Sequence, residues 1–332
     1  RQNLDFCKPL IYHQSPMKRN DAKMVYDIPT FNRIFPFLMK RRCDALVYHT
    51  CEFDVTKTVE YIRAYNAKKP EFRLKFFYVF CAALMRTIAM RPELNRFIAS
   101  YRYWQRDELS MNFVVKESFT DDAPETSNPL VFNPYMTLME YAKVIDDYIN
   151  KSRNLSEEDN FTDETISFFM HFPVWIISLV VRLARLLDRR GKAPSLLREA
   201  DGLHTSVFVS NLGSIGIIGG SPQHHLYEWG TTSLFVTLGG LERKREFDED
   251  GKVISSKETI KVGCTVDERI TSGFYFVKSM IYFQELLNNP QLLEEIPELP
   301  PPTPTRRQYN AKRRAERKTK RLAEKEKRKA SV

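Results

Sequence analysis

The chain has 332 residues, of which 42% are apolar, and this size and composition fit a globular protein of one large domain or two. Its five cysteines show no CxxC or CxxH spacing, which argues against a disulfide framework or a structural zinc site and favours a reducing compartment. The net charge of +9 is unevenly placed: residues 306–329 hold 13 of the 51 basic and three of the 42 acidic residues, which leaves 38 against 39 elsewhere. The folded part is therefore close to neutral, and a basic nucleic-acid-binding domain is not indicated for it.

The first third of the chain predicts an arm, a strand and two helices. Residues 1–30 are polar, contain three prolines and no recognisable signal peptide, and are expected to form an irregular arm. An apolar and basic segment at 31–42 is typical of a short helix, and the alternation over 47–55 predicts a strand. Residues 56–68 predict an amphipathic helix, and 72–90, apolar nearly all round, predict a buried one. The cysteine usage and the lack of a recognisable signal peptide together favour a cytoplasmic location.

The middle of the chain contains a turn, a hairpin and two helical segments. Residues 91–98, RPELNRFI, predict a turn that enters a strand, and 102–116 are interpreted as a hairpin. Residues 134–151 carry apolar side chains along one side of a helix. A run of 16 residues without formal charge, 166–181, then leads into arginines and a glycine that predict a helix end.

The hydrophobic helical segment 164–191 leaves two alternatives open. It is too short for a membrane span, which needs roughly 20 apolar residues, and Pro173 interrupts it. It either buries against protein, in the core or at an interface, or lies on a membrane surface with its aromatic residues embedded and its arginines at the headgroups. The second alternative leaves membrane association of a cytoplasmic protein open.

Residues 206–240 contain the first candidate site residues of the chain. The sequence SVFVSNLGSIGIIGG (206–220) predicts a strand whose end carries the small hydroxyl of Ser210, followed by glycines that let a substrate approach the backbone. Adjacent His224 and His225 lie on an extended segment, so we expect their side chains to point to opposite sides and at most one to face a site. The spacing gives no support for a metal site, and residues 224–240 are expected to end in a strand that includes Thr237.

Residues 262–287 combine a strand, a charged turn and a helix. The alternation up to Val266 predicts a half-buried strand, and apolar residues at helical spacing begin after Gly273. The turn between them reads DERITSG (267–273) and holds side chains rigidly at a strand end. The preceding hairpin is expected to turn at Asp250-Gly251.

The C-terminal part differs in composition from the rest. Residues 294–305 are rich in proline and predict an extended linker. Residues 306–332 carry no apolar stripe and are expected to be disordered or a solvated helix. Such a basic tail could bind nucleic acid, anionic lipid or an acidic protein, and its sequence does not choose among them.

Two of these motifs resemble the catalytic domains of the dihydrolipoyl acyltransferases of 2-oxo acid dehydrogenase complexes and the related chloramphenicol acetyltransferases. DERITSG is similar to their DHRxxDG or HHxxxDG signature, with Asp267, Arg269 and Gly273 in agreement, Glu268 in place of the catalytic histidine and Ser272 in place of the aspartate. VSNLG is similar to the SNLG motif, whose serine donates to the oxyanion. The resemblance also extends to the PELN turn.

The resemblance implies a chloramphenicol-acetyltransferase-like α/β fold over residues 31–293, a mixed sheet with helices on one face, assembled as a trimer with sites between subunits. It implies Glu268, Ser210 and His225 as candidate catalytic residues, the base being Glu268 or a relocated His225. Asp267, Arg269, Ser272 and Gly273 would hold the turn, and Thr237 would support the transition state. No metal is implied.

Two functional classes follow. The first is an acyltransferase that uses coenzyme A or another thiol carrier as substrate, with an unknown acceptor. The second is an inactive trimeric scaffold whose tail binds a polyanion or a membrane. A carboxylate near pKa 4.3 is a poorer base toward a thiol near 8.5 than an imidazole near 6.5, so the replacement of the histidine keeps the scaffold alternative open.

Overall fold

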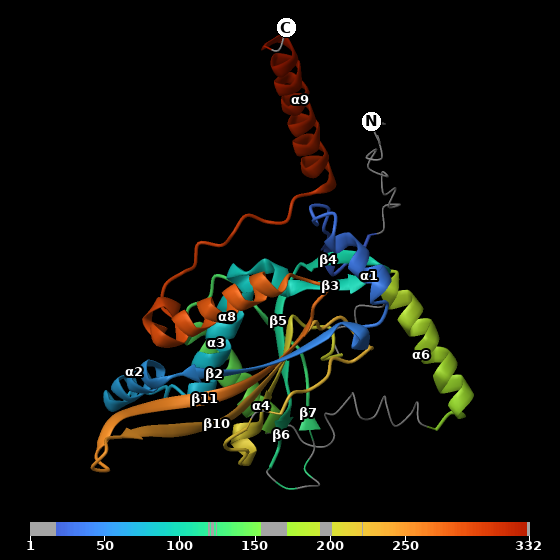
Figure 1. Cartoon of the computed structure of the whole chain (residues 1–332). Coiled ribbons are helices and arrows are strands. Elements are labelled where there is room, and N and C mark those ends of the chain that lie inside the picture. Colours follow the sequence, from blue (N-terminus) through green and yellow to red (C-terminus); the bar gives the residue numbers. More distant parts are fainter. Residues whose placement is uncertain are drawn as a thin grey trace.

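The computed structural model describes residues 18–118, 120, 123, 125–153, 171–192, 201–220 and 222–330. The predictions for residues 1–17 of the arm and for 164–170 lie outside them. A six-stranded sheet forms the centre of the molecule, in the order β2-β11-β10-β9-β5-β8 (Figure 1). Its strands are β2 (Leu46–Asp54), β5 (Leu109–Phe113), β8 (Leu130–Phe132), β9 (Val207–Asn211), β10 (Leu234–Phe247) and β11 (Val253–Asp267).

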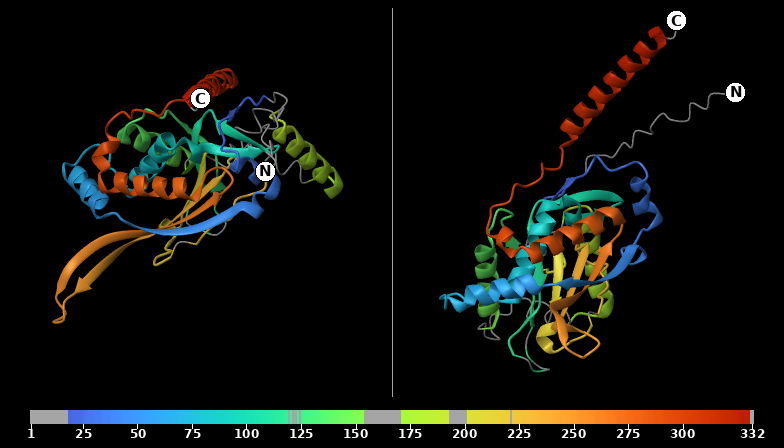
Figure 2. Two further views of the ribbon diagram at one scale, coloured as in Figure 1. Left: turned by 45° about the horizontal axis from the view of Figure 1, so that its top comes forward. Right: turned by 60° about the vertical axis from the view of Figure 1, so that its left-hand side comes forward.

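The sheet is mixed, as predicted. Strand β9 runs parallel to both of its neighbours, β10 and β5, whereas the remaining pairs of neighbours are antiparallel. The long β10–β11 hairpin turns at Gly251, whose φ of 77° is the left-handed conformation that glycine adopts without strain. Beyond Leu241 the hairpin leaves the sheet as an arm, which Figure 2 shows extending away from the body.

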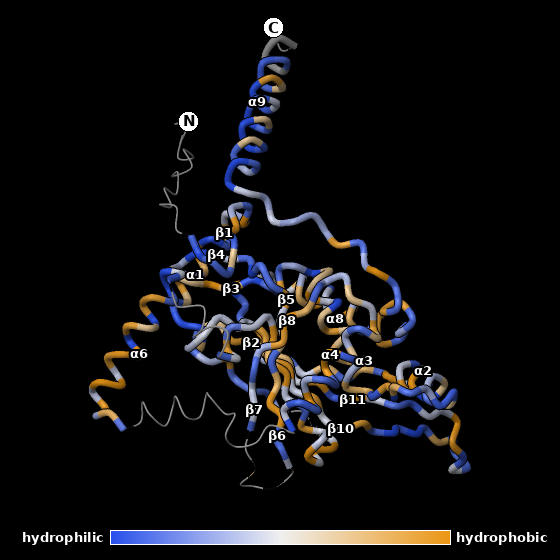
Figure 3. Tube along the Cα trace, turned by 180° about the vertical axis from the view of Figure 1, so that it is seen from behind, coloured by the Kyte–Doolittle hydropathy of each residue, from blue (hydrophilic) through white to orange (hydrophobic). Residues whose placement is uncertain are grey.

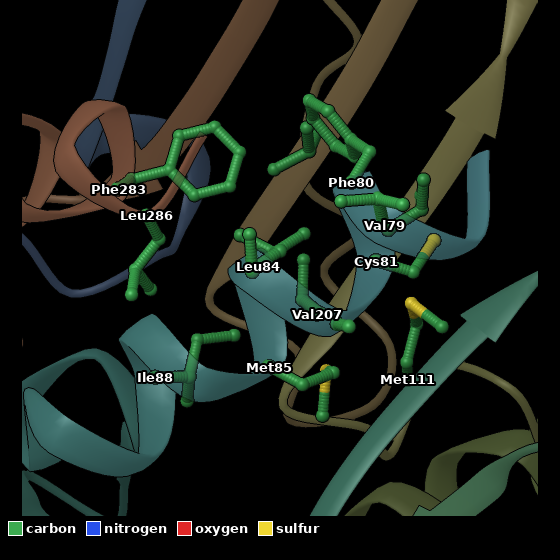
Figure 4. Packing of buried hydrophobic residues seen from close by; sticks show 14 of the residues in the cluster. Val79, Phe80, Cys81, Leu84, Met85, Ile88, Met111, Val207, Phe283 and Leu286 are labelled. Carbon is green, nitrogen blue, oxygen red and sulfur yellow. The ribbon is translucent and has the colours of Figure 1, made fainter. Parts of the chain in front are cut away.

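The helices α2, α3, α4 and α8 gather on one face of this sheet and enclose the main core. Figure 4 shows how α3 fills it: Phe80 and Leu84 lie toward α8 residues such as Phe283, and Met85 lies near Val207 of the sheet. Because α3 contacts both the sheet and the helices α2, α4 and α8, it is apolar nearly all round. The helix bounds are α2 (Thr56–Ala67), α3 (Phe76–Met90), α4 (Leu138–Arg153) and α8 (Gly273–Asn288).

Two predictions in the N-terminal third are wrong. The segment 102–116 is not a hairpin, because β4 (Arg102–Arg106) pairs in a three-stranded sheet while β5 belongs to the six-stranded sheet. The N-terminal arm, residues 1–30, is also not irregular throughout, because Ala22–Met24 forms β1 at one edge of this three-stranded sheet. The third strand there is β3 (Arg96–Ala99).

Short elements complete the body. They are the 3-10 helices η1 (Asn32–Ile34), η2 (Cys43–Ala45), η3 (Pro92–Asn95), η5 (Leu212–Ile215) and η6 (Pro290–Leu293), the helix α1 (Phe35–Leu38) and the strand pair β6 (Val115–Lys116) and β7 (Glu125–Thr126). The PELN turn predicted from the sequence is η3.

Helix α6 (Val174–Arg189) stands out from the body with an exposed apolar surface (Figure 3). Val174 is 81% and Trp175 68% exposed, and Asp188 is the buried residue of the helix. Within one chain the helix is therefore not buried in a core, and an interface or a membrane surface remain the predicted alternatives. Among the described residues, no helix has the length and apolar content needed to cross a membrane.

The chain ends in helix α9 (Arg306–Ala330), which projects from the body after the proline-rich segment (Figure 1). Of the two states expected for the tail, the structure adopts the solvated helix, with nearly every side chain up to residue 326 exposed.

Candidate functional site

The turn after β11 is held by a buried ion pair. Asp267 is fully buried and receives two hydrogen bonds from the Arg269 guanidinium, Nε to Oδ1 at 2.8 Å and Nη2 to Oδ2 at 2.7 Å. The Arg269 Nη1 atom also donates to the Met39 carbonyl at 2.8 Å. Burial would lower the pKa of Arg269, but the hydrogen bonds and charge of Asp267 outweigh it and raise that pKa. The two residues thus fix the backbone on both sides of Glu268.

Glu268, which stands between these two residues in the sequence, is exposed. Its backbone N–H donates to the Ala45 carbonyl at 2.9 Å, so the backbone that carries the carboxylate is held against the start of β2. Two residues of the turn begin α8: Ser272 is its N-cap and accepts from the Tyr275 N–H at 3.3 Å, and Gly273 is its first residue. A serine fills this capping position as an aspartate would.

The η3 turn braces the same motif from the other side. The Thr271 hydroxyl donates to Glu93 Oε2 at 2.6 Å, and the Arg91 guanidinium lies 3.8 Å from the centre of the Tyr275 ring. Neither Glu93 nor Arg91 was predicted from the sequence as a site residue, although the PELN pattern pointed to their segment. These contacts make the turn a rigid place from which Glu268 projects.

Ser210 lies near the end of β9, partly exposed, on the sheet face opposite the main core. The SNLG turn that follows it folds back against β10. A side chain at Gly213 would come within 2.5 Å of the Gly239 carbonyl oxygen, so only glycine permits this approach. The Gly240 N–H donates to the Ile217 carbonyl at 2.8 Å and fastens the turn there.

Thr237 of β10 is the direct neighbour of Ser210 in the sheet, but its hydroxyl is engaged. It is 2% exposed and donates to the Pro222 carbonyl at 2.5 Å. The segment around Pro222 and Gln223 therefore lies over the sheet beside Ser210, and Gln223 is hydrogen-bonded to Thr50 of β2. In this arrangement Thr237 holds the covering segment rather than lining an open site.

The expectation that His224 and His225 point to opposite sides is wrong. Their rings stack on each other at 4.6 Å between centroids, and the His224 ring also stacks on Phe235 at 4.3 Å. Phe235 in turn stacks on Phe208, which shares a sheet face with Ser210 because the two are two residues apart in β9. Attraction among the rings overrides the alternation of an extended segment, and it places His225 on the Ser210 side of the sheet.

The structure separates the two motif residues within one chain. Ser210 pairs with Thr237, which pairs with Gly263, and Glu268 follows Gly263 by five residues, directly after the end of β11. With strands about 4.8 Å apart and a rise of about 3.3 Å per residue, Ser210 and Glu268 are on the order of 20 Å apart. One chain therefore brings Ser210 to the same side of the sheet as His224 and His225 and not close to Glu268.

Arg42 contacts both the turn after β11 and the segment that follows His225, and it was not predicted from the sequence. Its guanidinium donates to the carbonyls of Tyr227 and Gly230, the latter at 3.0 Å, and its Nε lies 3.9 Å from Asp267 Oδ2. Burial lowers the pKa of this arginine. The distance between Arg42 and Tyr227 in the sequence, 185 residues, explains why no local pattern could reveal it.

A buried charged cluster links Trp229, which lies four residues after His225, to helix α6. His204 lies between two carboxylates, with Nδ1 at 3.1 Å from Asp201 and Nε2 at 3.4 Å from Asp188. Arg19 binds Asp188 at 2.9 Å, and the Trp229 indole N–H donates to Asp201. Burial alone would lower the pKa of His204, but the two carboxylates raise it. Burial would raise the pKa of Asp188, but His204 and Arg19 lower it to about 2.

We expect the attachment of α6 to depend on pH. The depressed pKa of Asp188 contributes stability above about pH 4, which is lost as the pH falls toward 2, and the raised pKa of His204 contributes stability below about pH 6.5, which is lost as the pH rises. Hydrogen exchange of the last turn of α6, corrected for intrinsic rates, should be slower at pH 5.5 than at pH 8.5. In His204→Gln this difference should disappear, and an unchanged difference would contradict the role of His204.

Among the described residues, no group of three or more histidine, cysteine, aspartate or glutamate side chains is placed to hold a metal ion.

No protein-family model and no curated protein sequence matches the chain. Its structure is similar to a probable dihydrolipoamide acetyltransferase from Listeria monocytogenes, with a TM-score of 0.50 and 14% identity over 80% of this chain and 94% of that one. It is also similar to the dihydrolipoamide acetyltransferase of Azotobacter vinelandii (TM-score 0.51, 14% identity, 88% and 98% covered), which has been studied for the role of a serine, a histidine and an asparagine in its catalytic mechanism. The cubic core of a pyruvate dehydrogenase multienzyme complex gives a TM-score of 0.51 and 16% identity over 88% and 98%.

These similarities confirm the predicted resemblance at the level of the fold. The chain has the chloramphenicol-acetyltransferase-like α/β fold of the dihydrolipoamide acetyltransferases. At such low identity the activity, the substrate and the oligomeric state do not follow from the fold.

Proposed function

We propose that the protein is an acyltransferase that takes an acyl group from coenzyme A or another thiol carrier. The observation that carries this proposal is the placing of Ser210: a hydroxyl at the end of a buried strand, partly exposed and followed by a tightly packed glycine turn. A donor held in this way can stabilise the oxyanion of a tetrahedral intermediate without reorganisation during the reaction.

The proposal requires a base that accepts the proton of the acyl acceptor or thiol. Glu268 stands where the resemblance places a histidine, and it projects from a rigid turn into solvent. Because it lies on the order of 20 Å from Ser210 in the same chain, it can act there only from a second copy. His225 is the alternative, since it shares the sheet face of Ser210 within one chain.

Exposed apolar residues near the turn support assembly with further copies, which the resemblance predicts to be a trimer. Helix α8 exposes Phe274 by 75%, Val277 by 52% and Ile281 by 55%, which lie on one side of the helix. On the same side of the sheet, the edge strand β2 exposes Val47 by 38%, two residues before His49, whose ring lies against Phe276 of α8. An exposed apolar surface of this kind is typical of a protein interface.

An inactive trimeric scaffold is the second candidate function. It is favoured by two observations: the base position holds a glutamate, and the hydroxyl of Thr237 is bound to the segment that covers the sheet beside Ser210. In a scaffold the covering segment would stay in place, whereas in an enzyme it must leave room for the acyl group.

Binding of coenzyme A to the full chain separates these candidates, because calorimetry should detect it for an acyltransferase. Light scattering should give about three times the 39.0 kDa of one chain for either candidate, and it tests whether Glu268 can act from a second copy. A trimer that neither binds coenzyme A nor cleaves acetyl-coenzyme A would support the scaffold. A monomer would remove Glu268 from consideration, because it could not meet Ser210.

A further inference from the structure

Helix α9 is a strongly charged surface that the proposed function does not use. Residues 306–329 hold 13 basic and three acidic side chains, and the helix stands in solvent away from the sheet (Figure 2). Five basic residues lie together along one side of it because of their helical spacing: Arg314, Arg317, Lys318, Arg321 and Lys325. All five are exposed. We call these five residues the basic face.

The base of the helix is fixed to the body. The Tyr309 ring stacks on Tyr26 at 6.1 Å between centroids, and its hydroxyl accepts a hydrogen bond from Arg33 Nη2 at 3.2 Å. Arg313 lies 5.6 Å from the centre of the same ring. The first turn of α9 is thus held, whereas the side chains of the basic face beyond it are exposed.

The side chains of α9 exclude two kinds of partner. A membrane-surface helix buries an apolar face, and beyond Tyr309 the described side chains include one large apolar residue, Leu322. A protein interface centres on aromatic or apolar anchors and is depleted in lysine, whereas α9 is rich in lysine and its aromatic residue, Tyr309, is already occupied. Stacking on unpaired bases would also need free aromatic rings.

The remaining partner is a regular array of negative charges. With 25 residues and a rise of about 1.5 Å per residue, α9 is about 37 Å long. The basic face, from Arg314 to Lys325, spans about 17 Å of this length, which is about half of one duplex turn of 34–36 Å. Arginine and lysine heads on flexible stems can reach phosphates along that half-turn without any fixed geometry.

We propose that α9 binds the phosphate backbone of double-stranded nucleic acid and does not read its sequence. With about five phosphates contacted by the basic face, the affinity falls as roughly the 4.5th power of the salt concentration, or about 500-fold between 50 and 200 mM.

Fluorescence anisotropy with a labelled 20-base-pair duplex of mixed sequence, as DNA and as RNA, tests this on the full chain. Both duplexes should bind with the expected salt dependence and more tightly than either single strand. Replacing Arg314, Arg317, Lys318 and Arg321 with glutamine should weaken binding on the order of 100-fold at 100 mM salt. Glutamine keeps the helix propensity, so circular dichroism should not change.

A matched variant removes four exposed charges from the body, and it should bind as the wild type does: Lys68, Arg245, Lys252 and Lys257, each changed to glutamine. A chain ending at Pro300 should lose binding and keep its melting temperature, because α9 buries almost nothing. Binding that survives loss of the basic face, that is insensitive to salt, or that favours phosphatidylglycerol vesicles or single strands over duplexes would overturn the proposal. None of these outcomes depends on acyl transfer.

Discussion

Replacing Asp267 with asparagine is expected to lower the free energy of unfolding by about 3–5 kcal/mol, because the change leaves buried cations without their partner. Asp267 is fully buried, and the guanidinium of Arg269 binds both of its carboxylate oxygens. Arg42, also buried, lies 3.9 Å from the same carboxylate. Asparagine has the size of aspartate, so the loss would report charge rather than packing. Urea denaturation monitored by circular dichroism measures it.

The chain offers a matched control in Asp44. This aspartate pairs with Arg41 at 2.8 Å, but both side chains reach solvent. Exposed pairs contribute little to stability, so Asp44→Asn should leave the denaturation midpoint nearly unchanged. If Asp267→Asn were equally mild, the arginines would find sufficient partners in backbone carbonyls such as that of Met39, and the turn would not depend on the ion pair.

The sequence predicted the strand, the turn and the helix start around DERITSG because local rules determine them. In DERITSG the roles of Ser272 as helix cap and Gly273 as first helical residue follow from local rules that act within a few residues. The strand before the turn and the helix after it show their own periods, because one face of each is buried. Local chemistry and burial therefore agree here on where the strand ends and where the helix begins.

Where the structure depends on contacts distant in sequence, the prediction failed. Nothing in residues 102–116 shows that β4 and β5 enter different sheets, because each strand has an ordinary alternation and only its partners differ. Alternation along an extended segment did not predict the positions of His224 and His225, because it takes no account of Phe235. The His224 ring stacks on Phe235 and the His225 ring on His224, so both histidines lie on one side of the sheet. Likewise, Arg19 meets Asp188 across 169 residues.

The second large effect concerns Ser210. Changing it to alanine should lower turnover about 10²–10³-fold with little effect on substrate binding, because one donor to the oxyanion is lost. Glu268→Gln or His225→Asn should lower turnover further, according to which residue is the base. Glu246→Gln, on the exposed hairpin arm, is the matched control for a lost carboxylate and should be fully active. Full activity of Ser210→Ala would exclude the oxyanion role.

Mixing inactive variants distinguishes the two bases by geometry. Ser210 and Glu268 of one chain are on the order of 20 Å apart, so a site that uses both must draw them from different copies. Co-refolded Ser210→Ala and Glu268→Gln chains should then regain wild-type residues in about a quarter of their sites, since chains combine at random in a symmetric oligomer. His225 lies on the Ser210 side of its own chain, so mixing Ser210→Ala with His225→Asn should restore nothing if His225 is the base. Recovery in the second mixture but not in the first would contradict both assignments, because it would require a histidine from the neighbouring copy.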